Sequence, residues 1–62
     1  MIGLKARRLI AGLTQAEAAK AAGVSRTALS RWEAGKASPT AETLVKLATI
    51  YKCTPGDFFA LY

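Results

Sequence analysis

The 62-residue sequence contains no histidine, a single cysteine (Cys53) and only four acidic side chains. Without histidine, neither a Ser-His-Asp nor a Cys-His relay can form, and the Cys/His clusters that hold structural zinc cannot be assembled. One cysteine makes no internal disulfide and is typical of a reducing compartment. We therefore expect that the protein is not an enzyme, that it binds no metal or other cofactor, and that it is cytoplasmic.

Long hydrophobic runs are also missing. The longest apolar stretch near the start, residues 9–13, is too short for a signal-peptide core and far shorter than a membrane-spanning helix. Hydrophobic residues make up 52% of the chain and charged residues 21%, which differs from the composition of disordered chains. The sequence predicts a single folded domain over residues 1–62 with no membrane partner.

The basic side chains gather in the first half of the chain. Nine Lys and Arg stand against four Asp and Glu, a formal net charge of +5. Residues 1–36 hold seven of the basic side chains and two of the acidic ones, whereas residues 37–62 hold two of each. A basic surface on a neutral support is typical of a protein that faces a polyanion. On charge alone, a generally basic soluble protein is the alternative.

Helix signals recur along the chain, whereas alternating β-branched runs and hairpin turn pairs are absent. Residues 4–11 are rich in Leu, Ala, Arg and Lys, and Gly12 ends that run. Thr14 and Glu17 have the spacing of a capping box, which predicts a second helix that continues as far as Gly23.

Three further helices are predicted after Gly23. Ser25 caps a third helix through residue 34, and Thr40 caps a fourth through about residue 51. Thr54 and Asp57 form a second capping box, which begins a short fifth helix. The sequence therefore predicts a compact all-α domain of five short helices.

The spacing around Gly23 carries the functional argument. Only Val24 and Ser25 separate the second helix from the third, and a short turn with glycine between two short helices is the helix-turn-helix pattern. Ala19 is small enough for the two helices to cross closely, and Gly23 can adopt the positive φ that the turn needs. The sequence therefore predicts a helix-turn-helix over about residues 15–34.

On a helical wheel, the third helix divides into two faces. Ala28, Leu29 and Trp32 form the apolar face, which we expect to meet the core. The opposite face carries side chains that can bond guanine, other base edges or phosphates, namely Arg26, Thr27, Ser30 and Arg31. An ordinary solvated face is the alternative, but the turn spacing and the one-sided charge favour a functional face.

Residues 4–59 resemble the phage-repressor-like (Cro/cI, Xre-type) helix-turn-helix family. The resemblance rests on residues 13–17 (LTQAE) with Ala19, on residues 23–26 (GVSR) and on residues 29–36 (LSRWEAGK). Pro39, the pair at 43–44 and the closing segment 54–59 follow in the family's register. The resemblance implies a five-helix, lambda-repressor-like DNA-binding domain whose third helix enters the major groove of double-stranded DNA.

The resemblance also implies roles for individual residues. The base-reading positions are Arg26, Thr27, Ser30 and Arg31. The Ser30 hydroxyl could instead contact the DNA backbone. The phosphate-contacting positions are Gln15, Ser25, Lys36 and Ser38. Arg8 and Glu33 match a structural pair that joins the first helix to the end of the third, and so Arg8 is not expected to touch DNA.

The sequence departs from the family at two points. Ala18 stands where the family often carries a bulky aliphatic residue, and we expect Trp32 to fill that space as a core residue rather than to stack on a base. Ile10 stands where the family tends to be polar. It is expected to share an exposed apolar patch with three residues near the C-terminus, Phe59, Leu61 and Tyr62. Self-association and fraying of the C-terminus both explain such a patch.

The sequence therefore predicts a sequence-specific, repressor-like transcriptional regulator with residues 25–34 in the major groove. Because one module reads few base pairs, a homodimer on a two-fold operator is expected, with the last helix as its contact. The alternative is a protein-interaction module on the same fold, such as an antitoxin with a toxin partner or an adaptor that contacts RNA polymerase. Affinity for mixed duplex DNA distinguishes the two.

Overall fold

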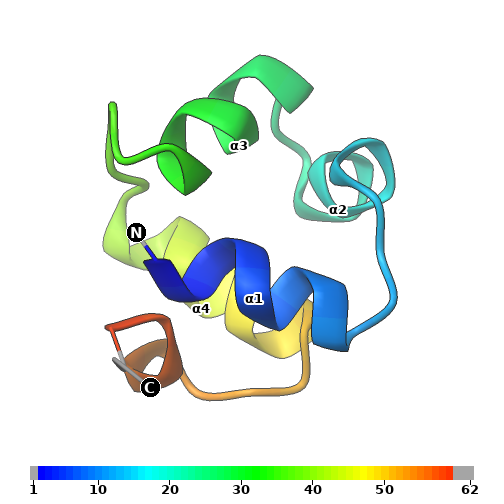
Figure 1. Cartoon of the computed structure of the whole chain (residues 1–62), viewed down its shortest axis with the longest axis vertical. Helices are drawn as coiled ribbons and strands as arrows, with labels where there is room; N and C mark the ends of the chain where they lie inside the picture. The colour runs from blue at the N-terminus through cyan, green and yellow to red at the C-terminus, as the bar shows by residue number, and fades with distance from the viewer. Residues whose placement is uncertain (1, 60–62) are drawn as a thin grey trace.

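The computed structural model describes residues 2–59, and every regular element within them is helical (Figure 1). In chain order, the elements are α1 (Ile2–Ile10), α2 (Gln15–Ala22), α3 (Arg26–Glu33), α4 (Ala41–Ile50) and the 3-10 helix η1 (Pro55–Phe59). Over the same residues, none of the helices has the length and apolar character needed to cross a bilayer.

The fifth predicted α-helix is wrong in type, because η1 is a 3-10 helix. Half of the predicted capping box is confirmed, since the Thr54 N–H donates to Asp57 Oδ2 over 2.9 Å, whereas the Asp57 N–H donates to the Thr54 carbonyl over 3.0 Å. The second bond has the i to i+3 spacing of a 3-10 turn. A five-residue segment provides too few i to i+4 bonds to offset the cost of starting an α-helix.

The four α-helices begin and end close to the predicted positions, and the predicted caps of the second, third and fourth are confirmed. Thr14 Oγ1 accepts from the Glu17 N–H (3.1 Å), and Glu17 Oε1 accepts from the Thr14 N–H (2.9 Å), which completes the capping box. The bond from the Thr14 N–H holds the pKa of Glu17 below its usual value. Ser25 Oγ accepts from the Ala28 N–H (3.0 Å), and Thr40 caps α4 in the same way.

The core is built from few large side chains and several small ones. Its buried members are Leu4, Ala18, Ala19, Ala22, Leu29, Leu47, Ala48, Tyr51 and Phe58. The alanines of α2 let that helix pack closely against both α3 and α4, while α1 packs on α3 and η1. Trp32 is half-buried and packs against this cluster, in agreement with its interpretation as a core residue.

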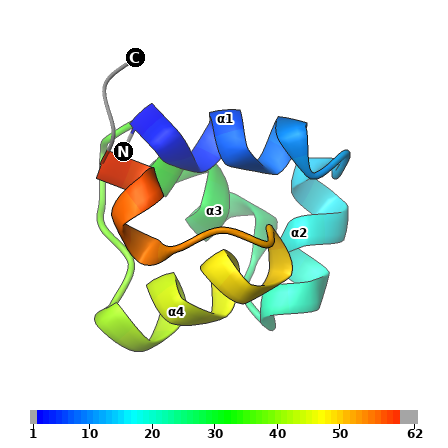
Figure 2. The ribbon, with the colours of Figure 1, turned by 90° about the horizontal axis from the view of Figure 1, so that it is seen from below.

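The apolar patch predicted around Ile10 is not assembled by the described residues. Ile10 and Phe59 are both exposed, at 73% and 61%. However, η1 runs toward the beginning of α1, where the Phe58 backbone faces Gly3 (Figure 2). Ile10 ends α1 about 10 Å farther along the helix axis, and so the two exposed side chains lie at opposite ends of α1. Leu61 and Tyr62 lie outside the described residues.

The contact between α1 and η1 requires glycine at position 3. A Cβ atom at Gly3 would lie 2.5 Å from both the Cα and the carbonyl oxygen of Phe58, and 2.7 Å from the carbonyl oxygen of Asp57. Real Cβ atoms do not approach backbone so closely, and backbone cannot move aside as a flexible side chain can. The absence of a side chain therefore sets how closely the C-terminal turn can approach α1.

We expect Gly3→Ala to destabilise the domain by about 1–3 kcal/mol, because η1 must shift away from α1. Helix propensity alone predicts the opposite sign, a gain of roughly 0.5–1 kcal/mol. The matched control is Gly56→Ala, where the nearest atom to the added methyl group is Thr54 Oγ1 at 3.8 Å. Urea unfolding followed by circular dichroism measures both; a Gly3→Ala protein as stable as the parent would contradict the packing argument.

Candidate nucleic-acid interface

Helix α3 lies at one end of the molecule, with one side against the core and the other open (Figure 1). Gly23, in the left-handed region at φ 71°, turns the chain between α2 and α3. Leu29 is fully buried, and Ala28 and Trp32 are half-buried on the same side of α3. This side holds the helix against α1 and α2, which leaves the opposite side facing solvent.

The outward side of α3 carries the four residues predicted to read bases. Arg26, Thr27, Ser30 and Arg31 are all exposed. Within residues 2–59, neither arginine takes part in an ion pair. Their guanidinium groups therefore keep all their N–H donors for a ligand, in the fork geometry that suits guanine edges and phosphates.

The four residues predicted to contact phosphates have more varied surroundings. Lys36 and Ser38 are exposed in the segment between α3 and α4. Ser25 is exposed at the beginning of α3, and its hydroxyl can still donate because the cap uses it only as an acceptor. Gln15 begins α2 and is half-buried, with Nε2 donating to Glu33 Oε1 over 3.0 Å. One N–H and the carbonyl of its side chain remain available.

A buried ion pair holds α3 against α1. Arg8 Nε lies 2.7 Å from Glu33 Oε2, and Arg8 Nη2 lies 3.3 Å from Glu33 Oε1. Arg8 Nη1 also donates to the carbonyl of Leu13 over 2.8 Å. We call Arg8, Glu33 and Gln15 together the bracket, because they tie α1, the beginning of α2 and the end of α3 to one another.

The charged pair of the bracket is largely shielded from water, with the side chains of Arg8 and Glu33 only 7% and 4% exposed. The hydrogen bond with Glu33 raises the pKa of Arg8. If α1 and α3 shifted relative to each other, each charge would be buried without its partner, which is costly. The pair therefore favours the one arrangement of these two helices in which Arg8 and Glu33 meet. Arg8 and Glu33 were expected to pair from the family resemblance, whereas the contact between Gln15 and Glu33 had no sequence signal.

Tyr51 lies close enough to the bracket for the charges of Glu33 and Arg8 to act on its hydroxyl. Its ring meets Phe58 edge to face, with centroids 6.0 Å apart at 87°. Only 4% of the residue is exposed, and within residues 2–59 its hydroxyl oxygen has no hydrogen-bond partner. Burial, followed by the charge of Glu33, raises the pKa of Tyr51 to about 12.

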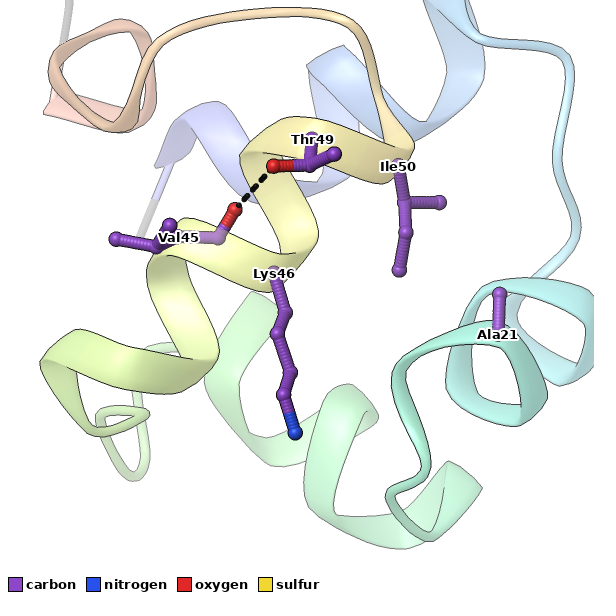
Figure 3. A pocket seen from close by; sticks show the side chains of 5 residues that line it. All are labelled: Ala21, Val45, Lys46, Thr49 and Ile50. Atoms are coloured by element: carbon purple, nitrogen blue, oxygen red, sulfur yellow. Dashed lines mark hydrogen bonds between the residues drawn. The ribbon is translucent and has the colours of Figure 1, made fainter.

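Among the hollows of the described part of the chain, two lie beside α2. The first, of about 380 Å³, is an apolar groove between α2 and α4 lined by Ala21, Val45, Lys46, Thr49 and Ile50 (Figure 3). The second, of about 200 Å³, lies between α1, α2 and α3, and its lining is Lys5, Gln15, Ser30, Glu33 and Ala34. We call it the polar hollow. Lys5 was not predicted as a site residue, although its position one turn before Arg8 places both residues on the side of α1 that meets α3.

The described part of the chain offers little for metal binding or nucleophilic chemistry. It contains no group of three or more His, Cys, Asp or Glu residues that could hold a metal ion. The thiol of Cys53 is half-buried, and burial raises its pKa, which disfavours the thiolate.

The helix-turn-helix family model matches residues 4–58. The chain therefore belongs to the helix-turn-helix family, of the phage-repressor-like (Cro/cI, Xre-type) kind that its sequence resembles. The comparisons with curated proteins and with solved structures gave no match. Membership of this family implies DNA binding rather than catalysis.

We expect Glu33→Ala to lower the free energy of unfolding by about 3–5 kcal/mol, because the Arg8 guanidinium would stay buried without its partner. Urea titrations at low temperature, where a folded baseline survives, measure the loss. The control is Arg7→Ala, which removes the half-exposed pair of Arg7 Nη2 and Asp57 Oδ1 at 3.7 Å and should cost less than about 1 kcal/mol. Equal effects of the two substitutions would show that the bracket is not held by its charges.

The raised pKa of Tyr51 predicts that the fold loses stability at alkaline pH. A raised pKa in the folded state stabilises the fold fully below the unfolded value of about 10, and this contribution disappears as the pH rises through about 12. Tyr51→Phe should flatten that fall while leaving stability at pH 7 unchanged or slightly higher, since no hydrogen bond is lost. Urea titrations between pH 7 and 12 test both expectations, and the titration of lysines affects both proteins alike. Parallel alkaline profiles would be inconsistent with the burial of this phenol.

Proposed function

We propose that the protein is a sequence-specific, repressor-like transcriptional regulator that binds double-stranded DNA in the cytoplasm. The observation that carries this proposal is the pair of exposed arginines, Arg26 and Arg31, on the outward side of a helix that the bracket fixes. Neither guanidinium is neutralised within residues 2–59. A rigid helix with uncommitted forked donors suits the major groove, which is wide enough to admit it.

Affinity in this proposal comes from the DNA backbone. Gln15, Ser25, Lys36 and Ser38 supply the phosphate contacts, and they lie at the beginning of α2, at the beginning of α3 and in the segment after it. Each cationic contact releases counterions, and so binding weakens as salt rises. These contacts position α3 and carry no sequence information directly.

Selectivity in this proposal comes from the outward side of α3. Arg26 and Arg31 each have the donor geometry for guanine O6 and N7, and the Thr27 methyl group suits a thymine methyl. Ser30 can bond a base edge or the backbone. Because α3 has only eight residues, one module reads few base pairs. Binding as a homodimer to half-sites about 34 Å apart doubles the contacts and is part of the proposal.

A protein-interaction module on the same fold, such as an antitoxin or a polymerase adaptor, would need a docking surface. The groove between α2 and α4 is lined by only five residues, whereas a stable protein interface buries about 800 Å² on each partner. The groove also contains a single cation, Lys46, and no acidic residue. The exposed basic side of α3 therefore supports DNA as the partner over this alternative.

We expect Arg31→Ala to weaken binding to the preferred duplex by about 1–3 kcal/mol, since one base contact is lost. The duplex is first selected from a random pool with the parent protein, and anisotropy titrations then compare parent and variant on it and on a mixed-sequence duplex. Stability in urea should not change, because Arg31 is exposed and outside every ion pair within residues 2–59. The mixed-sequence duplex is the control, and Arg31→Ala should weaken binding to it less than binding to the preferred duplex.

Two outcomes count against this reading. If the parent selects no sequence from the pool, the regulator proposal fails and a protein partner becomes the better explanation. If the parent selects a sequence that Arg31→Ala binds equally well, Arg31 does not read bases.

A further inference from the structure

The polar hollow contains a cation that no family resemblance assigned. It lies where α1, α2 and α3 meet, and Lys5 contributes its only basic side chain. We propose that Lys5 binds a phosphate oxygen of the DNA backbone in this hollow. The proposal rests on DNA binding by α3 and adds a contact from α1, outside the helix-turn-helix.

The charges of α1 point to Lys5. Three basic residues lie on this helix, and two of them are already committed. Arg8 is buried against Glu33, and Arg7 forms an ion pair with Asp57 that joins α1 to η1. Lys5 is exposed, and within residues 2–59 it forms no ion pair. Among the described residues, it is therefore the one cation of α1 whose charge no ion pair neutralises.

The carboxylate in the polar hollow does not oppose an anion there. Glu33 lines the hollow, but both of its oxygens are occupied, Oε2 by Arg8 and Oε1 by Arg8 and Gln15. The guanidinium at 2.7 Å balances its charge. The lining therefore presents the net charge of Lys5, with the remaining amide N–H of Gln15 and the Ser30 hydroxyl as further donors.

The position of the polar hollow connects it to the surface that reads bases. Ser30 belongs both to the lining of the hollow and to the outward side of α3. A DNA strand whose bases meet Arg26 and Arg31 therefore runs past the hollow on the α1 side of α3. The small side chain of Ala34 leaves this approach open.

The experiment compares Lys5→Gln with Lys52→Gln, two substitutions that remove one positive charge each. Lys52 follows α4 and is exposed, in the segment that lies at the opposite end of the molecule from α3 (Figures 1 and 2). Anisotropy titrations of each protein on one mixed-sequence duplex between 50 and 250 mM salt give the slope of log K against log salt. Urea unfolding of each protein confirms that the fold is retained.

We expect Lys5→Gln to make the salt slope shallower by about 0.9, the value for one phosphate contact, and to weaken binding several-fold at 0.1 M salt. The sequence selected from a random pool should stay the same, because a phosphate contact does not read bases. Lys5→Arg should restore the slope, and Lys52→Gln should resemble the parent.

Equal slopes for Lys5→Gln and Lys52→Gln would overturn the assignment of Lys5 while leaving the proposed function intact. A changed sequence preference in Lys5→Gln would overturn it as well, since the residue would then act on α3. If the parent itself does not bind duplex DNA, the proposed function fails, and the contact from Lys5 fails with it.

Discussion

The orientation of α3 depends on the buried ion pair between Arg8 and Glu33, residues that lie on different helices and are almost completely shielded from water. Removing two charges from water is expensive, and such a pair adds little net stability compared with apolar residues of the same size. It does penalise any arrangement in which the partners separate, because each charge would then be buried alone. We infer that the pair contributes chiefly to the orientation of α3.

Small side chains between the helices make this constraint effective. The buried surface of α2 consists of alanines, and α1 meets η1 through Gly3. Such contacts bring backbones close together but provide less apolar area per residue than leucine or phenylalanine. A 62-residue domain also buries a smaller share of its surface than a large one, which leaves its stability modest. Polar contacts between helices therefore carry more of the geometry here than in a domain with a larger core.

The sequence predicted the features that depend on neighbouring residues. The caps at Thr14, Ser25 and Thr40, the glycine turn at Gly23 and the two sides of α3 follow from local hydrogen bonding and helical periodicity. The type of η1 could not be predicted, because the same residues cap the first turn of α- and 3-10 helices and their spacing does not show which hydrogen-bond pattern follows.

The features that sequence reasoning missed depend on contacts between distant elements. Gln15 bonds Glu33 eighteen positions away, and Lys5 joins Ser30 only because α1 packs against α3. Ile10 and Phe59 were grouped by their hydrophobicity, whereas the direction of η1 separates them. The spacing of Lys5 from Arg8 shows which side of α1 it lies on, but one sequence does not show which residues of a distant element any of these side chains meets.

Net charge is a poor measure of the charge that a ligand meets on this molecule. Residues 1–36 hold seven basic side chains, but Arg7 and Arg8 are held in ion pairs that serve the fold. The partner of Arg7, Asp57, lies in the half of the chain that is neutral by sequence, and so the two halves are not electrostatically separate. Lys5, Arg26 and Arg31 are exposed and outside every ion pair within residues 2–59, whereas Arg7 and Arg8, the other cations of α1, are neutralised. The basic surface is therefore a property of the packing, which decides which charges remain available to a polyanion.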